Sequence, residues 1–371
     1  MVFSKVIIIT PSFEQRVSKM AYELTSAGYK CEVLAEEAQV ADEFKNYVES
    51  IPFSVIPCSQ KLRRTPLGRE RIRFIRDKVR QAVKSESGVL IIARDVNYGS
   101  IVLSAVRPLK SDNIRIVTDV ADNYDLIYAS YGNPLKKVIL RLGFSYLTKK
   151  AFRKSDALLV VTPVNIPRIR ERYPFTTDKP IFVLRNLPLG YRFIKNEEKL
   201  PKSMVYIGKI DEISRDPFYV LDNLTAMEDY TLHFYSSQKA TTISAIRKAA
   251  DEKGISDRVI FHERVPYDML AEEISKYSVG LVPHKRSPVT DYTVPNKIYD
   301  YKSSGVVTVM SDCPALVYEN DAFRFGLVYS REKNNFADVI KEAESYDLDF
   351  SVEMPDWNTE FSDVLNELKN I

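Results

Sequence analysis

Residues 293–309 carry the residue types from which a phosphate site could be built. They read TVPNKIYDYKSSGVVTV, so a proline, an asparagine and a lysine come before a short helical pattern that ends at a glycine. Proline in the first turn and glycine after the last turn are the usual boundaries of a helix. The N–H groups at a helix start attract phosphate, and Lys297 would add a full positive charge. An ordinary helix with a surface lysine would show the same pattern.

A second cationic loop follows the strand expected over residues 203–207. It reads GKIDEISR and places Lys209 and Arg215 at a turn from strand to helix. A departing diphosphate gains negative charge on its oxygens as its bond to carbon breaks, and such cations would stabilise it. A basic surface loop is the alternative. If Lys297 lies beside this loop, three cations converge at the carboxyl edge of one sheet.

These loops need a parallel sheet to position them, and the chain contains two series of strands. Short apolar runs alternate with helical patterns, and a chain of 371 residues is long enough for two domains. We therefore predict an α/β protein with two facing Rossmann-like doubly wound domains, each with its ligand site at the carboxyl ends of the strands. The expected domains are 1–190 and 191–371, and the amphipathic tail over 358–368 could cross back to the first.

Charge supports this division. Residues 1–190 carry 31 Lys and Arg against 19 Asp and Glu, whereas the remainder carries 22 against 31. Opposite net charges indicate that the two halves meet different partners.

The basic character of the first half is concentrated in residues 61–80. Nine Lys and Arg residues there face only Glu70 and Asp77, and apolar residues interleave with them. Such a segment could lie against anionic phospholipid or hold a phosphorylated acceptor, and a solvated helix with one apolar stripe is the alternative. No nucleic-acid reading motif accompanies the charge, so nucleic acid is not the expected partner. The acceptor or membrane candidates in this segment are Arg69, Arg73 and Arg76.

Taken together, these motifs resemble those of the group-one, family-four-like GT-B glycosyltransferases, which use sugar nucleotides. In that family a Gly-Arg is followed by a Lys six positions after the Arg, and here Lys209 and Arg215 fill those places with the two cations exchanged. The signature Pro-x-Lys-x-x-Glu-Tyr, closing on a small residue and glycine, is matched with an aspartate in place of glutamate. The donor-binding residues that this resemblance implies are Gly208, Lys209, Arg215, Pro295, Lys297, Asp300, Tyr301 and Gly305.

Two departures from the family pattern bear on the chemistry. The paired acids of the family would fall on Tyr292 and Asp300, so the first acid is absent unless the neighbouring Asp291 substitutes. The family's Gly-Gly after the first strand is missing as well. The sequence therefore leaves open whether the product retains or inverts the configuration of the donor. The Arg-Val at Arg16 and Val17 is similar to a subset of the family and makes Arg16 a further candidate on the acceptor side.

An attacking hydroxyl usually gives its proton to a carboxylate or a histidine. All histidines fall in the second half, and His284, after the strand expected over 279–282, could touch the donor. In the first half, Asp119 and Asp122 follow the strand over 114–118. Arg94, which follows the strand over 89–93, is a further acceptor or membrane candidate. We expect Asp122, and then Asp119, to act as base or acceptor ligand, with helix capping as the alternative.

The sequence thus predicts a cytoplasmic hexosyltransferase-like enzyme, associated at most peripherally with the inner face of a membrane. It would move sugar from a nucleotide-diphosphate donor to a saccharide or lipid-linked acceptor in polysaccharide or glycolipid synthesis, without metal or another cofactor. Its three widely spaced cysteines indicate neither a disulfide framework nor a zinc site, and no apolar run approaches the roughly 20 residues that span a bilayer. An epimerase or phosphorylase on the same fold, or a non-catalytic protein that binds nucleotide sugars or membranes, is the alternative.

Overall fold

The computed structural model describes residues 3–40, 49–57, 68–109, 111–121, 134–188, 193–194, 196, 198–210, 214–236 and 240–371. The chain divides into two compact units, one of Met1–Asn186 with Trp357–Ile371 and the other of Leu187–Asp356. The first boundary falls a few residues before the expected one. The sequence-based limit of the second domain at residue 371 differs from the structure, which gives the last segment to the first unit.

The first unit is built on a parallel sheet. Within the described residues its strand order is β3-β2-β1-β4-β5-β6-β7. The strands are β1 (Lys5–Phe13), β2 (Lys30–Val40), β3 (Phe53–Val55), β4 (Val89–Arg94), β5 (Ile114–Val120), β6 (Ala157–Val160) and β7 (Ile181–Val183). Runs of β-branched residues such as those of β1 are buried on both faces, as parallel strands between two helical layers require.

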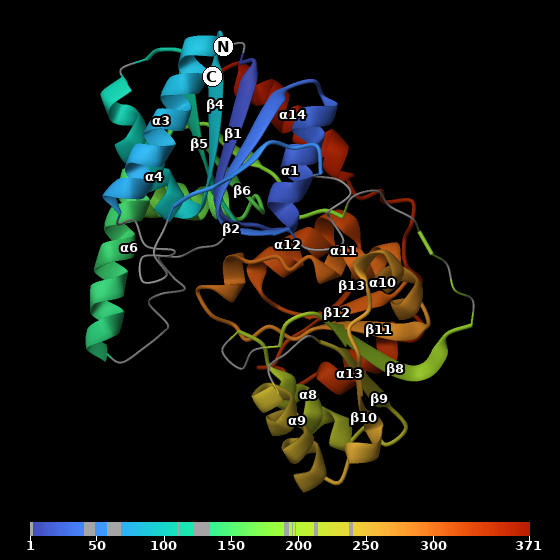
Figure 1. Ribbon diagram of the computed structural model, residues 1–371. Helices are drawn as coiled ribbons and strands as arrows, with labels where there is room; N and C mark the ends of the chain where they lie inside the picture. The colour runs from blue at the N-terminus through green and yellow to red at the C-terminus, as the bar shows by residue number, and fades with distance from the viewer. Residues whose placement is uncertain are drawn as a thin grey trace. The chain divides into compact units, whose positions relative to one another are not determined.

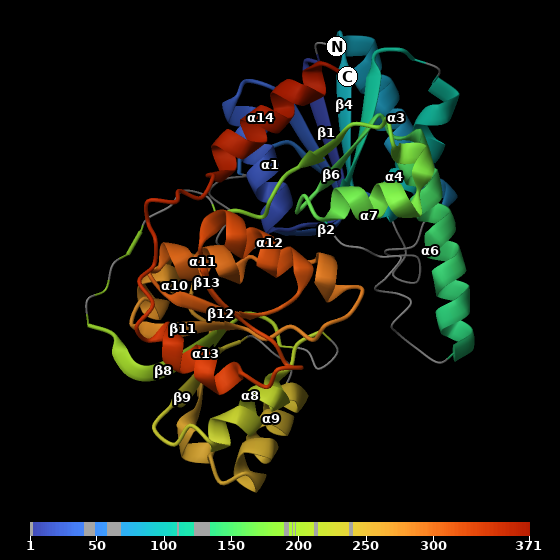
Figure 2. The same ribbon diagram turned by 180° about the vertical axis from the view of Figure 1, so that it is seen from behind.

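Helices cover both faces of this sheet (Figures 1 and 2). They are α1 (Gln15–Ser26), α3 (Arg69–Ser85), α4 (Asp95–Val106), α6 (Pro134–Lys154), α7 (Asn165–Arg172) and α14 (Trp357–Lys369). The helices α1 and α14 lie on one face, and α3, α4 and α6 lie on the other. One core unites Ile75 and Val79 of α3 with Ile101 of α4 and with Ile7 and Ile91 of the sheet.

The second unit repeats the arrangement with the order β10-β9-β8-β11-β12-β13. Its strands are β8 (Leu200–Ile207), β9 (Thr231–Tyr235), β10 (Val259–His262), β11 (Tyr277–Val282), β12 (Val307–Ser311) and β13 (Gly326–Tyr329). Its helices are α8 (Pro217–Thr225), α9 (Ala240–Glu252), α10 (Tyr267–Ile274), α11 (Lys297–Ser303), α12 (Pro314–Phe323) and α13 (Phe336–Ala343).

Both sheets are doubly wound, and all of their paired strands run parallel. The strand order reverses between β1 and β4 in the first unit and between β8 and β11 in the second. Ligands of such folds bind outside the carboxyl ends of the strands at this reversal. Ligand-binding residues are therefore expected in the loops after β8 and β11 in one unit, and after β1, β4 and β5 in the other.

Candidate functional site

In the second unit the loop after β8 is tied to the end of β11. Arg215 and His284 form an isolated antiparallel bridge. The N–H of Asp216 donates to the Pro283 carbonyl at 2.8 Å, and that of Lys285 donates to the Ser214 carbonyl at 3.1 Å. Although the two segments are distant in sequence, these bonds fix them side by side at the reversal point of the sheet. Two of the candidate donor residues, Arg215 and His284, are therefore neighbours.

His284 is a buried imidazole in a cationic setting. Neither of its ring nitrogens has a hydrogen-bond partner among the described residues. Burial first, and then the charges of Arg215 and Lys297, hold the pKa of His284 well below its usual value. The ring is therefore neutral near pH 7 and carries both a donor and an acceptor. Buried polar groups are normally hydrogen-bonded, so an imidazole in this state is suited to a polar ligand.

Lys297 approaches the same site from the start of α11. Its side chain is buried, and its ammonium lies 3.5 Å from the centroid of the Tyr206 ring. The aromatic face stabilises a cation that would otherwise be costly to bury. Tyr206, near the end of β8, supplies this aromatic face. No motif in the sequence indicated its contact with Lys297. The ammonium of Lys297 therefore lies beside the end of β8, the strand that leads into the cationic loop.

The start of α11 itself differs from the expected phosphate-binding helix. The helix has only seven residues. The N–H groups of Tyr299 and Asp300 donate to the Asn296 carbonyl, at 2.9 and 3.3 Å, and that of Ile298 reaches the Pro295 carbonyl at 3.4 Å. Because the N–H groups of Ile298 and Tyr299 are already engaged, α11 contributes mainly the Lys297 side chain. Pro295 sets the entry of the chain into this turn.

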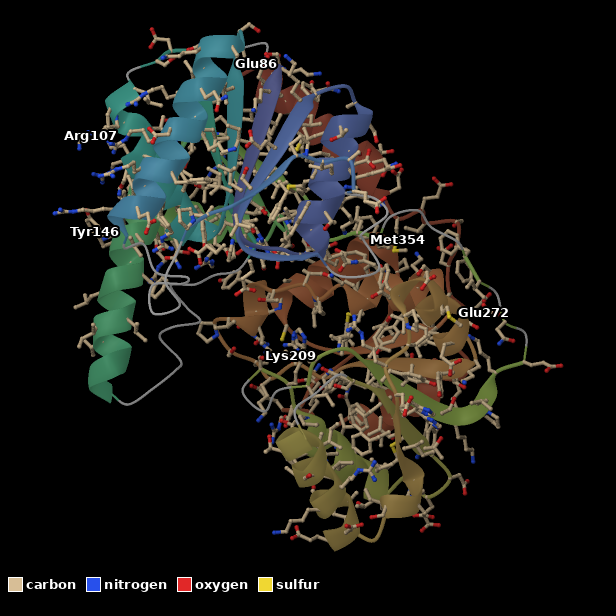
Figure 3. All side chains as sticks on the ribbon, in the orientation of Figure 1. Glu86, Arg107, Tyr146, Lys209, Glu272 and Met354 are labelled. Atoms are coloured by element: carbon tan, nitrogen blue, oxygen red, sulfur yellow. The ribbon has the colours of Figure 1, made fainter. Side chains whose placement is uncertain are left out.

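Gly208 and Lys209 begin the loop after β8, where Figure 3 labels Lys209. Gly208 has a φ of 82°, a conformation that glycine adopts without strain, and its N–H donates to the Tyr235 carbonyl at 2.9 Å. The Tyr206 hydroxyl donates to the Lys209 carbonyl at 2.6 Å. The Lys209 side chain is exposed, so it can move toward a ligand at the edge of the sheet.

Asp300 lies one turn beyond Lys297 and is half-buried. It accepts a hydrogen bond of 3.2 Å from the Tyr267 hydroxyl of α10. Tyr267 is a second contact that the sequence did not reveal, since it precedes Asp300 by 33 positions. The substitute acid Asp291 is engaged elsewhere, because its carboxylate accepts from Arg286 at 2.7 Å.

Two residues expected to bind the donor have structural roles instead. Tyr301 is fully buried, accepts from the Ile207 N–H and donates to the Val205 carbonyl, both at 3.1 Å, so it fastens α11 beneath β8. Gly305 follows α11 and precedes β12, which places it at the amino edge of the sheet, opposite Lys297. Its φ of 64° allows the turn out of α11.

In the first unit Asp119 is a buried clamp and not an available base. Nε and Nη2 of Arg16 donate to its two carboxylate oxygens at 2.9 and 2.8 Å. Burial alone raises the pKa of Asp119, but the guanidiniums of Arg16 and Arg94 outweigh it and the net shift is downward. The Asp119 carboxylate is enclosed, is paired with two guanidiniums and is a weaker base than usual. It therefore cannot accept a proton from an acceptor hydroxyl.

Arg16 is fully engaged by the fold as well. Its Nη1 donates to the Leu184 carbonyl at 3.0 Å and to Oδ1 of Asn186 at 2.8 Å. The residue that was expected to face an acceptor or a membrane is therefore buried. It joins the start of α1 to the ends of β5 and β7.

Arg94 is also buried at this edge, but one of its carboxylate partners is exposed to solvent. Its Nε donates to Oε1 of Glu14 at 2.6 Å, and its Nη1 lies 3.4 Å from Oδ2 of Asp119. The Glu14 side chain is 41% exposed, so this edge presents an accessible carboxylate that the sequence did not single out. Asp122, the preferred base, lies outside the described residues.

The basic segment proves to be a helix whose apolar side is already in use. Residues 58–67 lie outside the described residues, and the rest forms α3. Ile75 and Val79 pack into the core of the sheet, so this apolar stripe is not available to a membrane. Arg69 and Arg73 are exposed, whereas Nε of Arg76 donates to the Ala105 carbonyl at 3.1 Å. Only a purely electrostatic contact remains open to α3.

The described residues hold no cluster of three or more His, Cys, Asp or Glu side chains placed to bind a metal ion. Over the same residues, no helix has the length and apolar character needed to cross a membrane.

No protein-family model matches the chain, and no curated protein sequence matches it. Several solved structures do. A lipopolysaccharide outer core galactosyltransferase, in its apo form, is 14% identical with a TM-score of 0.63, covering 98% of this chain and 99% of that one. Anabaena HepE, solved with UDP-glucose, is 10% identical with a TM-score of 0.64 and complete coverage of both chains.

A third match is the UDP-forming α,α-trehalose-phosphate synthase of Burkholderia xenovorans, solved with glucose-6-phosphate. It is 11% identical with a TM-score of 0.67, covering 98% of this chain and 100% of that one. At such low identity, similarity over the full length shows the fold. The chain has the two-domain GT-B fold of these glycosyltransferases.

Proposed function

We propose that the protein is a glycosyltransferase that moves a sugar from a nucleotide-diphosphate donor to a hydroxyl of a saccharide or lipid-linked acceptor. The observation that carries this proposal is the grouping of Arg215, Lys297 and the unpartnered ring of His284 at the reversal point of the second sheet. The cations of Arg215 and Lys297 would bind the anionic part of a ligand, and the neutral His284 ring would hydrogen-bond a polar group joined to it. The second unit would hold the donor.

In the proposed reaction the bond between the anomeric carbon and the diphosphate oxygen breaks, and its electron pair stays on the diphosphate. Arg215 and Lys297, with Lys209 swinging in from the exposed loop, would stabilise that charge. With three cations available, the site needs no divalent metal. Asp300 would bind a hydroxyl of the donor ribose while Tyr267 orients its carboxylate.

The acceptor hydroxyl would bond to the anomeric carbon and pass its proton to a carboxylate of the first unit. Asp122 remains the proposed base, and Glu14 is a second candidate because its carboxylate is exposed just after β1, at the carboxyl edge of the first sheet. The fold accepts substrates of these kinds, since HepE was solved with UDP-glucose and the trehalose-phosphate synthase with a sugar phosphate. If the acceptor is lipid-linked, the reaction takes place at the inner face of a membrane.

The test is turnover by Lys297→Ala and Arg215→Ala across a panel of nucleotide sugars and acceptors. We expect kcat/KM for transfer to fall about 100-fold or more in each variant, because each removes charge that stabilises the transition state. Arg215 is only half-buried, so its variant keeps the test meaningful if Lys297→Ala fails to fold. Lys248→Ala is the matched control, since that lysine is 78% exposed on α9.

Unchanged transfer in both variants would overturn the proposal. Conversion of the nucleotide sugar to its epimer without any acceptor would identify an epimerase. Binding of nucleotide sugar with neither transfer nor slow hydrolysis would identify a non-catalytic binding protein.

A further inference from the structure

Four large apolar side chains are exposed together on α6. Val138, Ile139, Leu142 and Tyr146 expose 54%, 60%, 67% and 67% of their surface. Ile139, Leu142 and Tyr146 are three and four positions apart and lie along one side of the helix, with Val138 next to them. Single exposed apolar residues are ordinary, whereas a contiguous row of them marks a contact surface.

The helix has two halves with different surroundings. Phe144, Leu147, Ala151 and Phe152 are buried in its C-terminal part, where α6 packs against α4. Lys150 holds this part in place by donating to the Ser100 carbonyl at 3.0 Å. Figures 1 and 2 show that the N-terminal half continues beyond the carboxyl edge of the unit's own sheet. The apolar row therefore lies on a firmly anchored helix that extends past the edge of its own sheet.

The charge on this helix has one sign. Residues 134–154 include no Asp or Glu, and their Lys and Arg residues are Lys136, Lys137, Arg141, Lys149, Lys150, Arg153 and Lys154. Arg141 and Lys149 are exposed, adjacent in sequence to Leu142 and within one turn of Tyr146 respectively. An apolar row flanked only by positive charge complements an anionic surface that has an apolar interior.

Neighbouring elements extend the positive surface. Figure 3 labels Arg107, just after α4, on the same side of the first unit as Tyr146. The exposed Arg73 and Arg80 of α3 belong to the helical layer that also contains α4 and α6. Each basic residue near an anionic leaflet adds to the attraction, so this layer can support the contact that α6 makes.

We propose that the exposed side of α6 docks the protein onto an anionic phospholipid bilayer, with Ile139, Leu142 and Tyr146 entering the boundary between headgroups and acyl chains. The alternative is that a second copy of the chain packs against the apolar row. A symmetric pair of α6 helices would bring two sets of Lys and Arg together with no carboxylates between them, and like charges oppose that contact. The inference concerns attachment alone, so it can hold or fail independently of the transfer reaction.

The test is co-sedimentation of the full-length protein with vesicles of phosphatidylcholine, with and without phosphatidylglycerol. We expect binding to require the anionic lipid and to weaken about tenfold or more in the double variant Ile139→Ser with Leu142→Ser, because both apolar contacts are lost. Met269→Ser is the matched control, since Met269 is 56% exposed on α10 of the second unit. Its binding should equal that of the unaltered protein.

Depth of insertion is measured with Tyr146→Trp and lipids brominated in the acyl chains. Bromine quenches an indole that reaches the hydrocarbon, so the new tryptophan should be quenched while the buried Trp357 is not. Equal vesicle binding by the double variant, or an unquenched tryptophan at 146, would overturn the proposal. So would a dimer in solution that the double variant converts to monomer, since that would assign the row to a second copy.

Discussion

Arg16 and Asp119 show how residues of types that could take part in catalysis can instead stabilise the fold. They are 103 positions apart, yet the guanidinium and the carboxylate meet in a two-fold hydrogen-bonded pair inside the first unit. Arg94 adds a second guanidinium at 3.4 Å. Because both partners are buried, each depends on the other to offset the loss of water. The pair closes the carboxyl edge of the sheet from within.

This pair predicts a stability change with a defined pH dependence. Asp119→Asn leaves the buried guanidinium of Arg16 without its carboxylate and removes one of the carboxylates beside Arg94, so we expect the free energy of unfolding at pH 7 to fall by about 3–5 kcal/mol. The pKa of Asp119 is lowered in the folded protein, so its contribution is complete above the unfolded value near 3.8 and is lost as the pH falls below it. Denaturant unfolding at pH 7 and at a pH below the unfolded value measures both effects.

Asp112→Asn is the control for this prediction, because Asp112 is an exposed aspartate of the same unit. Its stability should match that of the unaltered protein at both pH values. If Asp119→Asn were equally neutral at pH 7, the pair would not stabilise the fold.

At the scale of elements, the donor edge depends on the packing of α11 beneath β8 and β11. The Tyr301 ring fills the space next to Gly280 of β11, where a Cβ would come within 2.5 Å of the ring. The Tyr301 hydroxyl bonds the backbone of β8 on the neighbouring strand. One side chain thus sets the distance between α11, which carries Lys297, and the two strands whose loops carry Arg215 and His284.

Gly280→Ala is therefore expected to strain this junction. The added methyl group must displace a fully buried tyrosine, so we expect a loss of about 1–3 kcal/mol in the free energy of unfolding. Gly143→Ala is the control, since a Cβ there meets nothing within 4 Å. Thermal unfolding compares the two variants. A Gly280→Ala protein as stable as the Gly143→Ala protein would show that the ring moves aside freely.

The sequence was informative about elements with strong local patterns. Runs of β-branched residues predicted strands near those observed, such as residues 114–118 for β5 and 279–282 for β11. The short strands β3 and β13 were not predicted from the sequence. Apolar residues occur around all sides of α6, so periodicity alone could not tell its packed half from its exposed row.

The candidate site was predicted in part for the same reason. Lys297 and Arg215 belong to local motifs that name them. Long-range contacts leave no such pattern in the sequence. The sequence therefore predicted that Asp119 is a base and that Arg16 binds the acceptor. Tyr206, Tyr267 and Glu14 owe their roles to neighbours on other elements, which only the fold reveals.

At the scale of the whole molecule, the chain passes between the two units twice, after Asn186 and again after Asp356. The returning segment, α14, completes the first unit. Trp357 is fully buried, stacks on Phe361 at 5.7 Å and lies 4.2 Å from the ammonium of Lys19 in α1. Arg185 and Glu360 add an ion pair of 2.7 Å between α14 and the end of the first segment. The first unit is therefore complete only with the segment Trp357–Ile371.

Trp357→Ala is accordingly expected to destabilise the first unit by about 3–5 kcal/mol, because it removes a large buried ring from the α14 contact. Native-state hydrogen exchange locates the effect: protection should fall in β1 and α1 and stay unchanged in β8 and β11, which belong to the other unit. Trp357→Phe, which keeps an aromatic ring in place, should retain most of the protection. Equal loss of protection in both units would mean that α14 supports the molecule as a single cooperative whole, contrary to the division into two units.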